Sequence, residues 1–208
     1  PSRGLGDVYK RQISNDKHMQ EAFASGEDIH AVTASQVFDT PLSEVTSLQR
    51  SRAKAVNFGI VYGISAWSLA QDIGVFPNEA KAYMDAYFDK YNGVHEYMKH
   101  IVEQAKTDGY VKTLYNRRRA LPELKSSNFN MRSFGERVAL NMPIQGTAAD
   151  IIKLAMVNVY DRLKAEGLKS KLILQVHDEL ICECPEDEAD AVIKILSEEM
   201  SGVAKLSV

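Results

Sequence analysis

The hydrophobic positions of this chain recur mostly every three or four residues, which predicts an α-helix wherever the pattern lasts. Glycine, proline and Asn–Gly or Asp–Gly pairs interrupt the pattern and are expected to end the helices. Asn78 is expected to cap one helix, and Pro143 to break another. The predicted helices cover residues 16–24, 27–38, 50–65, 78–91, 94–107, 129–139, 147–166 and 187–200.

Two stretches depart from the helical period. Residues 171–184, KLILQVHDELICEC, place apolar runs on either side of a polar pair. This pattern predicts a β-hairpin with His177 and Asp178 at its tip. Residues 110–124, YVKTLYNRRRALPEL, predict a short strand or hairpin that runs into a basic loop. The fold class expected is therefore α+β and mostly helical, with one hairpin carrying acidic residues.

Three helices carry faces that are expected to be core. An aromatic stripe in helix 78–91 is most simply explained by packing between helices: Tyr83, Tyr87, Phe88 and Tyr91. The apolar face of helix 147–166 comprises Ile151, Ile152, Leu154, Ala155, Val159 and Leu163. The acidic last helix is expected to pack on the back of the hairpin through Ala191, Ile195 and Leu196.

The helix 50–65, RSRAKAVNFGIVYGIS, is different. Arg50, Lys54, Phe58 and Tyr62 follow one another at intervals of four, so they share one face. Two cations followed by two rings suit a ligand with phosphates at one end and a flat base at the other. The alternative is an ordinary amphipathic core helix with a basic end that reaches into solvent.

Two glycines lie beside the rings of this helix. Gly59 and Gly63 each cost a helix about 1 kcal/mol relative to alanine. Their presence predicts that something approaches the backbone closely at this point.

Composition excludes several classes of protein. With 45% hydrophobic and 25% charged residues, the 208-residue chain is typical of a soluble globular protein, either one large domain or a piece of a longer one. No run approaches the roughly 18 apolar residues that a membrane span needs. Cys182 and Cys184 are too close along one strand to pair well, and they form no zinc-ligand set. A reducing cytoplasm is the expected compartment.

The net charge of −3 hides a strong asymmetry. Residues 111–137 hold seven basic side chains against two acids, whereas residues 183–199 hold seven acids against one lysine. Because a polyanion responds to local charge, the basic region favours nucleic acid.

Several side chains in or after that basic region are candidates for DNA contact. Arg117, Arg118 and Arg119 form a run that favours phosphate contact over a merely solvated patch. Arg137, Asn141 and Gln145 recur every four residues along one polar edge, which suits base edges or sugars in a groove. An isolated edge of this kind would ordinarily face solvent.

The hairpin tip offers carboxylates for a metal. Asp178 and Glu179 are adjacent at the turn, and hard oxygen ligands suit Mg²⁺ bound together with substrate phosphates. Two such ions stabilise the attacking and leaving oxygens in phosphoryl transfer. Taken alone, the VHDE sequence is more simply a polar surface turn.

The combination of motifs resembles the family A DNA polymerases, the bacterial DNA polymerase I type. In order, R-x3-K-x3-F-G-x2-Y-G, N-x3-Q-G-T-A-A-D and Q-V-H-D-E-L cover nearly everything from residue 13 to residue 208. The resemblance implies DNA-templated transfer of a nucleotide from a dNTP to a primer 3′-hydroxyl, with two Mg²⁺ ions. It also implies primer-template DNA as partner and an intact enzyme that is monomeric and not in a membrane.

Carried over position by position, the resemblance assigns roles. Arg50, Lys54 and His30 would bind the dNTP phosphates, and Lys54 is also a candidate proton donor to pyrophosphate. Phe58 would pack on sugar and base, while Tyr62 and Gly63 border the nascent pair. Arg137, Asn141 and Gln145 would contact template and primer, and His177 the primer end. Asp178 would be the metal ligand, with Glu179 as its acidic neighbour. The charged and aromatic helix face is then expected to look across a gap at this turn.

The resemblance also implies a division of the chain. Residues 13–125 would be the fingers and residues 126–208 a partial palm. Residues 1–12 have no helical or strand periodicity and are expected to be a non-native segment. The family's second metal-binding aspartate falls at Pro1, and its motif is not found in residues 1–12. The sequence therefore predicts a polymerase fragment with negligible activity of its own. The alternatives are a catalytically silent nucleotide- or DNA-binding module, and a helical scaffold that buries the charged and aromatic face.

Overall fold

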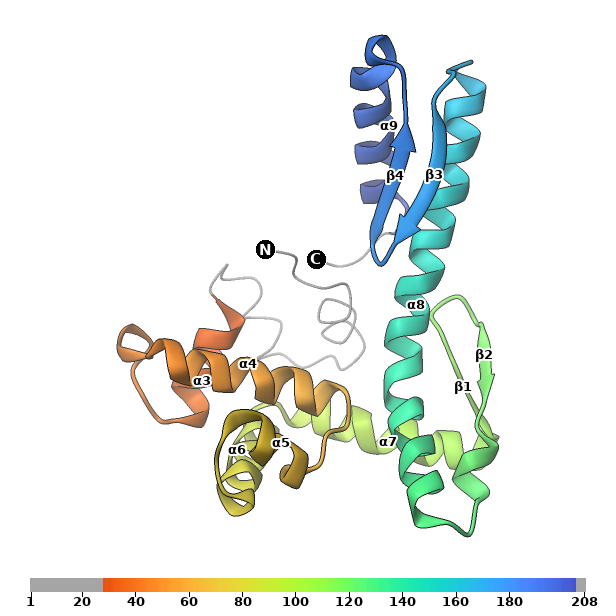
Figure 1. Ribbon diagram of the computed structural model, residues 1–208. Helices are drawn as coiled ribbons and strands as arrows, with labels where there is room; N and C mark the ends of the chain where they lie inside the picture. The colour runs from red at the N-terminus through yellow and green to blue at the C-terminus, as the bar shows by residue number, and fades with distance from the viewer. Residues whose placement is uncertain (1–27, 205–208) are drawn as a thin grey trace.

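The computed structural model of the chain describes residues 28–204. The segment 1–12 and the predicted helix 16–24 lie outside these residues. Figure 1 shows two groups of elements joined by one long helix, α8, which runs from the helices α3–α7 to a hairpin packed with α9.

The described part is α+β and mostly helical, as predicted. The chain order is α3 (Ile29–Val37), η1 (Leu42–Glu44), α4 (Ser47–Val61), α5 (Ala66–Ile73), α6 (Pro77–Lys90), α7 (Asn92–Asp108), β1 (Tyr110–Lys112), β2 (Arg118–Ala120), η2 (Pro122–Lys125), α8 (Phe129–Ala165), β3 (Lys171–Val176), β4 (Glu179–Glu183), η3 (Glu186–Glu188) and α9 (Ala189–Gly202).

The predicted break at Pro143 is wrong, because α8 runs through it for 37 residues. Proline lacks the N–H that would bond to the carbonyl of Ala139. Both residues are buried, and Ala139 packs in a cluster with residues of α7, β1 and η2. The Thr147 hydroxyl donates to the Pro143 carbonyl at 2.6 Å. Tertiary packing therefore outweighs the local cost of the proline.

Other helix details also differ from the predictions. Asn78 is not a cap: α6 begins after Phe76, with Pro77 as its first residue, where the fixed φ of proline suits a helix start. The helix α5 was not predicted; the Ser65 side chain caps its start and the left-handed Gly74 ends it.

Three hydrophobic clusters hold together the part of the chain that the structure describes. The first joins α4–α7 and contains Tyr87 and Tyr91, each 1% exposed, so the aromatic stripe of α6 is core as predicted. The third joins α8 to α9 through Val159, Leu163, Val192 and Ile195, with Leu180 and Cys182 of β4 beside them. The last helix thus packs on α8 as well as on the hairpin, with Val192 buried.

One position of the predicted α8 core face is wrong: Leu154 is exposed. The other five predicted core positions of this face are buried.

The predicted hairpin is present. β3 and β4 pair antiparallel from Lys171↔Glu183 to Val176↔Glu179, which leaves His177 and Asp178 as a two-residue loop. His177 takes a φ of 53°, as one residue of such a tight loop must. Cys182 and Cys184 are both free thiols, as predicted. In residues 28–204 no helix has the length and apolar character to cross a membrane.

Candidate nucleotide and nucleic-acid site

The charged and aromatic face of α4 is turned away from the core. The buried side of the helix is formed by Ala53, Val56, Asn57 and Ile60. Arg50 and Lys54 are exposed, Phe58 is half-buried and Tyr62 is 44% exposed. The alternative in which this face is buried in a scaffold is therefore wrong.

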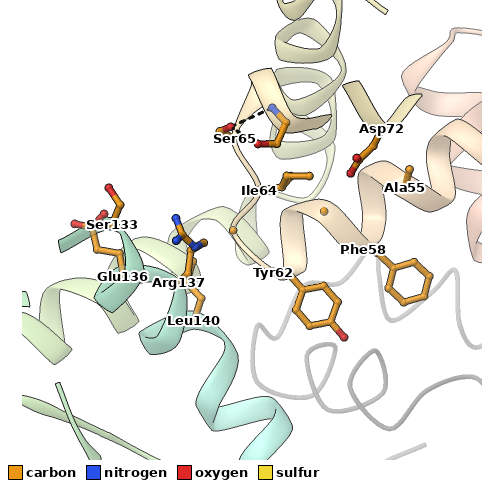
Figure 2. Close-up of a pocket in the computed structure, with 13 residues that line it drawn as sticks. Ala55, Phe58, Tyr62, Ile64, Ser65, Asp72, Ser133, Glu136, Arg137 and Leu140 are labelled. Carbon is orange, nitrogen blue, oxygen red and sulfur yellow. Dashed lines mark hydrogen bonds between the residues drawn. The ribbon is translucent and has the colours of Figure 1, made fainter. Parts of the chain in front are cut away.

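Figure 2 shows the two rings of this face projecting to the same side of the chain. Phe58 lies near the C-terminal end of α4, and Tyr62 is the C-cap residue of that helix. The Lys54 Nζ lies 5.9 Å from the centroid of the Phe58 ring. Cation and ring are thus neighbours, as the spacing of four predicts.

The helix α3 adds His30 to this face. Its ring centroid lies 5.8 Å from that of Phe58. The side-chain amide of Asn57 lies 3.0 Å from His30 Nδ1, and Asn57 also hydrogen-bonds the buried Thr33. Two helices therefore gather the imidazole with Lys54 and Phe58, which lie 24 and 28 positions after His30 in the chain.

Asp28 orders the N-terminal end of the face. It caps α3 by accepting from the His30 and Ala31 N–H groups, and it pairs with Arg50 at 2.6 Å. Partial burial alone would raise the pKa of Asp28, but the Arg50 guanidinium and the two backbone N–H groups outweigh it, so the pKa is lowered. The Arg50 side chain is thereby tied to the start of α3.

His30 is kept neutral by its surroundings. Partial burial lowers its pKa, and Arg50 and Lys54 lower it further, while Asp28 acts in the opposite sense. The ring Nδ1 accepts from Asn57 in this state, so the proton belongs on Nε2.

Two hollows meet where α4 ends against α8. The first, about 790 Å³, is lined by Phe58, Tyr62, Gly63 and Asp72 on one side and by Glu136 and Arg137 of α8 on the other (Figure 2). The second, about 620 Å³, shares Tyr62 and Arg137 with it and adds Arg119, Asn141 and Gln145. Four predicted DNA-contact residues and Tyr62 are thus brought together from distant parts of the chain.

The glycines beside the rings are explained by the chain itself. Gly63 has a φ of 69°, and a Cβ there would lie 3.0 Å from Leu140 Cδ1 and 3.3 Å from Arg137 Cγ. A Cβ on Gly59 would lie 2.6 Å from Ile64 Cγ2. The close approach predicted at these glycines is made by Ile64 and by α8.

The three consecutive arginines do not act as one patch. The Arg117 side chain remains 56% exposed, but its Nε donates to the buried Asp150 at 2.6 Å. Arg118 stacks on the Tyr110 ring at 4.8 Å. Arg119 pairs with Val111 in the strand register and so shares the face of that core residue, where it lines the second hollow. Of the three, Arg117 is the one paired with a buried carboxylate, that of Asp150.

The acidic turn lies apart from these hollows. His177, Asp178 and Glu179 are exposed, and in Figure 1 the hairpin turn points along α8 toward its middle. Neither hollow is lined by Asp178 or Glu179, so the expected facing of this turn and α4 stays a prediction.

The donor set of the turn fits a metal held mostly by other ligands. In the described part of the chain no three His, Cys, Asp or Glu side chains are gathered as a metal site. Two neighbouring carboxylates suit Mg²⁺, which keeps several waters and commonly binds one or two carboxylates plus phosphates. They would not suit a cage built from protein ligands alone.

Sequence reasoning missed Asp28, Asn57 and Asp150. Asp28 stands at the N-cap position of a helix, which is a recognisable signal. Asn57 interrupts the apolar side of α4, and Asp150 interrupts that of α8. A polar residue on a buried face needs a partner, so both positions were detectable as sites of internal hydrogen bonding.

The comparisons with known proteins agree with the motifs. The profile of DNA polymerase family A matches residues 11–208. The chain belongs to DNA polymerase family A. It is 52% identical to DNA polymerase I of Bacillus subtilis and 50% identical to that of Caldicellulosiruptor bescii, each over 94% of this chain. The chain spans only 22–23% of the length of these relatives.

A solved structure of the family is also similar. The polymerase domain of Pol1 from M. smegmatis, in complex with DNA primer-template and dNTP, shares 45% identity and a TM-score of 0.89. The likeness covers 99% of this chain and 36% of that one. The profile match covers residues 11–208, and every predicted site residue lies within that range.

Proposed function

We propose that this chain supplies the nucleotide-binding and much of the DNA-binding surface of a DNA-templated DNA polymerase. The observation that carries the proposal is the exposed face of α4, where Arg50, Lys54 and Phe58 stand beside His30 of α3. Family membership and the similarity to a Pol1 domain bound to DNA and dNTP support it.

In this proposal the triphosphate of a dNTP binds Arg50, Lys54 and His30. Guanidinium and ammonium groups form charge-assisted hydrogen bonds with phosphate oxygens, and a neutral imidazole with its proton on Nε2 is a further donor. Phe58 packs on sugar and base, and Tyr62 with Gly63 borders the new base pair. Lys54 is positioned to give a proton to the pyrophosphate that leaves.

Primer and template bind along the second hollow. Arg119, Arg137, Asn141 and Gln145 line it, and cations and amides of this kind bind phosphates and base edges. Arg118 on the opposite face of the strand and His177 at the hairpin tip are proposed to add contacts to the duplex. Arg117 is proposed to act less directly, since Asp150 holds it.

Asp178 would hold Mg²⁺, with Glu179 beside it. Two Mg²⁺ ions bound in the complete polymerase would stabilise the charge that develops when the 3′-hydroxyl attacks the α-phosphate. We also expect the intact polymerase to act as a monomer in the cytoplasm.

The test is nucleotide binding by this chain, measured by calorimetry with each dNTP and Mg²⁺. Lys54→Gln should weaken binding roughly tenfold, because a charge-assisted hydrogen bond to phosphate is lost. Lys164→Gln, the same charge change at an exposed position of α8, is the matched control. Equal affinities for both variants would refute the nucleotide site on α4.

A second candidate is a module that binds nucleotide and DNA without transferring the nucleotide. It is favoured by the two adjacent carboxylates of the turn, which in the described residues have no third ligand near them. Primer extension separates the two. Binding without incorporation supports the silent module, whereas incorporation abolished by Asp178→Ala shows that this chain carries the complete chemistry.

A further inference from the structure

The buried carboxylate of Asp150 ties the basic β1–β2 hairpin to α8. Its Oδ2 accepts from the Thr113 hydroxyl at 2.7 Å, and its Oδ1 accepts from Arg117 Nε at 2.6 Å. The Asp150 side chain is only 5% exposed. Burial alone would raise the pKa of Asp150, but Thr113 and Arg117 outweigh it and lower the pKa, so the group is an anion at neutral pH.

The turn between β1 and β2, residues 113–117, makes two further contacts with α8. The Leu114 N–H donates to the Thr147 hydroxyl at 2.9 Å, and Thr147 is completely buried. A Cβ on Gly146 would lie 2.7 Å from Thr113 Cγ2, so only glycine lets the turn come this close. Gly146, Thr147 and Asp150 therefore form one docking face for the hairpin turn.

The docked turn determines where Arg119 points. The strand pleat sends neighbouring side chains to opposite faces, and Arg119 shares the face of the buried Val111. In that position it lines the hollow with Tyr62, Arg137 and Gln145. Glu123 lies 3.8 Å from its guanidinium. A turn released from α8 would lose this orientation.

We propose that Asp150 is a positioning residue, which fixes the β1–β2 turn on α8 so that Arg119 is presented to a nucleic-acid phosphate in the hollow. The inference rests on the proposed function, because it requires that this hollow receive DNA. Asp150 anchors the turn through the Thr113 hydroxyl and Arg117 Nε, and the anchored strand then places Arg119 at the hollow.

The sign of one mutational effect tests this. Asp150→Asn removes a negative charge, so by long-range electrostatics alone it should strengthen DNA binding. If Asp150 positions Arg119, the variant instead binds roughly tenfold more weakly at about 50 mM salt, and the slope of log K against log[salt] becomes shallower by about 0.9, the share of one phosphate contact. Binding is measured by fluorescence anisotropy with a labelled primer-template duplex.

Two controls complete the design. Asp89→Asn makes the same charge change at an exposed position of α6 and should not weaken binding. In a double-mutant cycle, Asp150→Asn should add little to Arg119→Ala, because both remove the same contact. Additive losses would mean that Asp150 acts through stability and not through Arg119, and would overturn the proposal.

The outcomes remain separable if the first variant folds poorly. Thr113→Val is nearly isosteric, removes the hydroxyl that binds Asp150 and leaves the charge unchanged, so the same weakening and shallower slope are expected from it. Unchanged binding by a folded Thr113→Val chain overturns the proposal. If the wild-type chain itself does not bind the duplex, the proposed function fails; if it binds and Asp150→Asn behaves as Asp89→Asn does, only the positioning role fails.

Discussion

The side-chain amide of Asn57 and Nδ1 of His30 lie 3.0 Å apart, although 27 positions separate them in the chain. The amide donates to a ring nitrogen that must be unprotonated, and Thr33 holds the other side of Asn57. A residue that sequence reasoning did not single out thus hydrogen-bonds and orients the ring of one that it did.

Asn57→Ala should raise the pKa of His30 toward its ordinary value. The pKa is lowered by burial and by Arg50 and Lys54, and the amide adds a hydrogen bond that only the neutral ring accepts. An NMR titration of the ring signals measures the change, with the exposed His100 as internal reference. An unchanged titration of His30 would show that the amide has no part in holding the ring neutral.

The stability of the chain should rise with pH around the His30 transition. Because the folded pKa is below the unfolded value of about 6.5, the unfolded chain takes up the proton first as pH falls. His30 therefore costs stability progressively below about pH 6.5, and His30→Gln should flatten this part of the curve. Urea midpoints between pH 5 and 8 provide the measurement, and a curve of unchanged steepness would contradict it.

Gly63→Ala should destabilise the chain more than Gly74→Ala. Both glycines have left-handed backbones, with φ of 69° and 67°, and alanine in that conformation costs about 1 kcal/mol. A Cβ at Gly63 also meets Leu140 and Arg137 of α8, whereas one at Gly74 meets open space. The total for Gly63→Ala is expected to be about 2–3 kcal/mol by urea unfolding. Equal losses of stability would mean that Leu140 and Arg137 move away from the new Cβ at no measurable cost.

Thr147→Val should cost about 1–3 kcal/mol, because it leaves the Leu114 N–H without its acceptor in a partly buried contact. The matched control is Thr107→Val in α7. Thr107 also donates to the carbonyl four residues earlier, but it does so in an exposed position. The control should change the unfolding free energy by less than about 0.5 kcal/mol. Similar losses in both variants would refute the importance of the Leu114 contact.

Tyr62→Ala should separate binding from folding. The ring is 44% exposed, so its removal should leave the urea midpoint nearly unchanged, while a lost base-stacking contact weakens DNA binding by about 1–3 kcal/mol. Tyr87→Ala, in the core, should cost about 3–5 kcal/mol of stability. A Tyr62→Ala chain that binds primer-template as the wild type does would remove Tyr62 from the proposed site.

Local pattern was sufficient wherever local chemistry decides the structure. The spacing of four put Arg50, Lys54, Phe58 and Tyr62 on one face, and the apolar–polar–apolar order of residues 171–184 predicted the hairpin with His177 and Asp178 in its loop. Helix ends at Gly109 and Gly167 followed from the left-handed backbone that glycine adopts at little cost. These features depend on residues a few positions apart, so the sequence alone determined them.

Only the tertiary structure decided what distant residues do to one another. Pro143 should break a helix, but buried packing on both sides carries α8 through it. Arg117, Arg118 and Arg119 are chemically identical, and yet a turn, a strand pleat and one buried carboxylate give them three different surroundings. The physical reason is that burial and pairing depend on which segments meet in space. A pattern of neighbouring residues does not specify these long-range contacts.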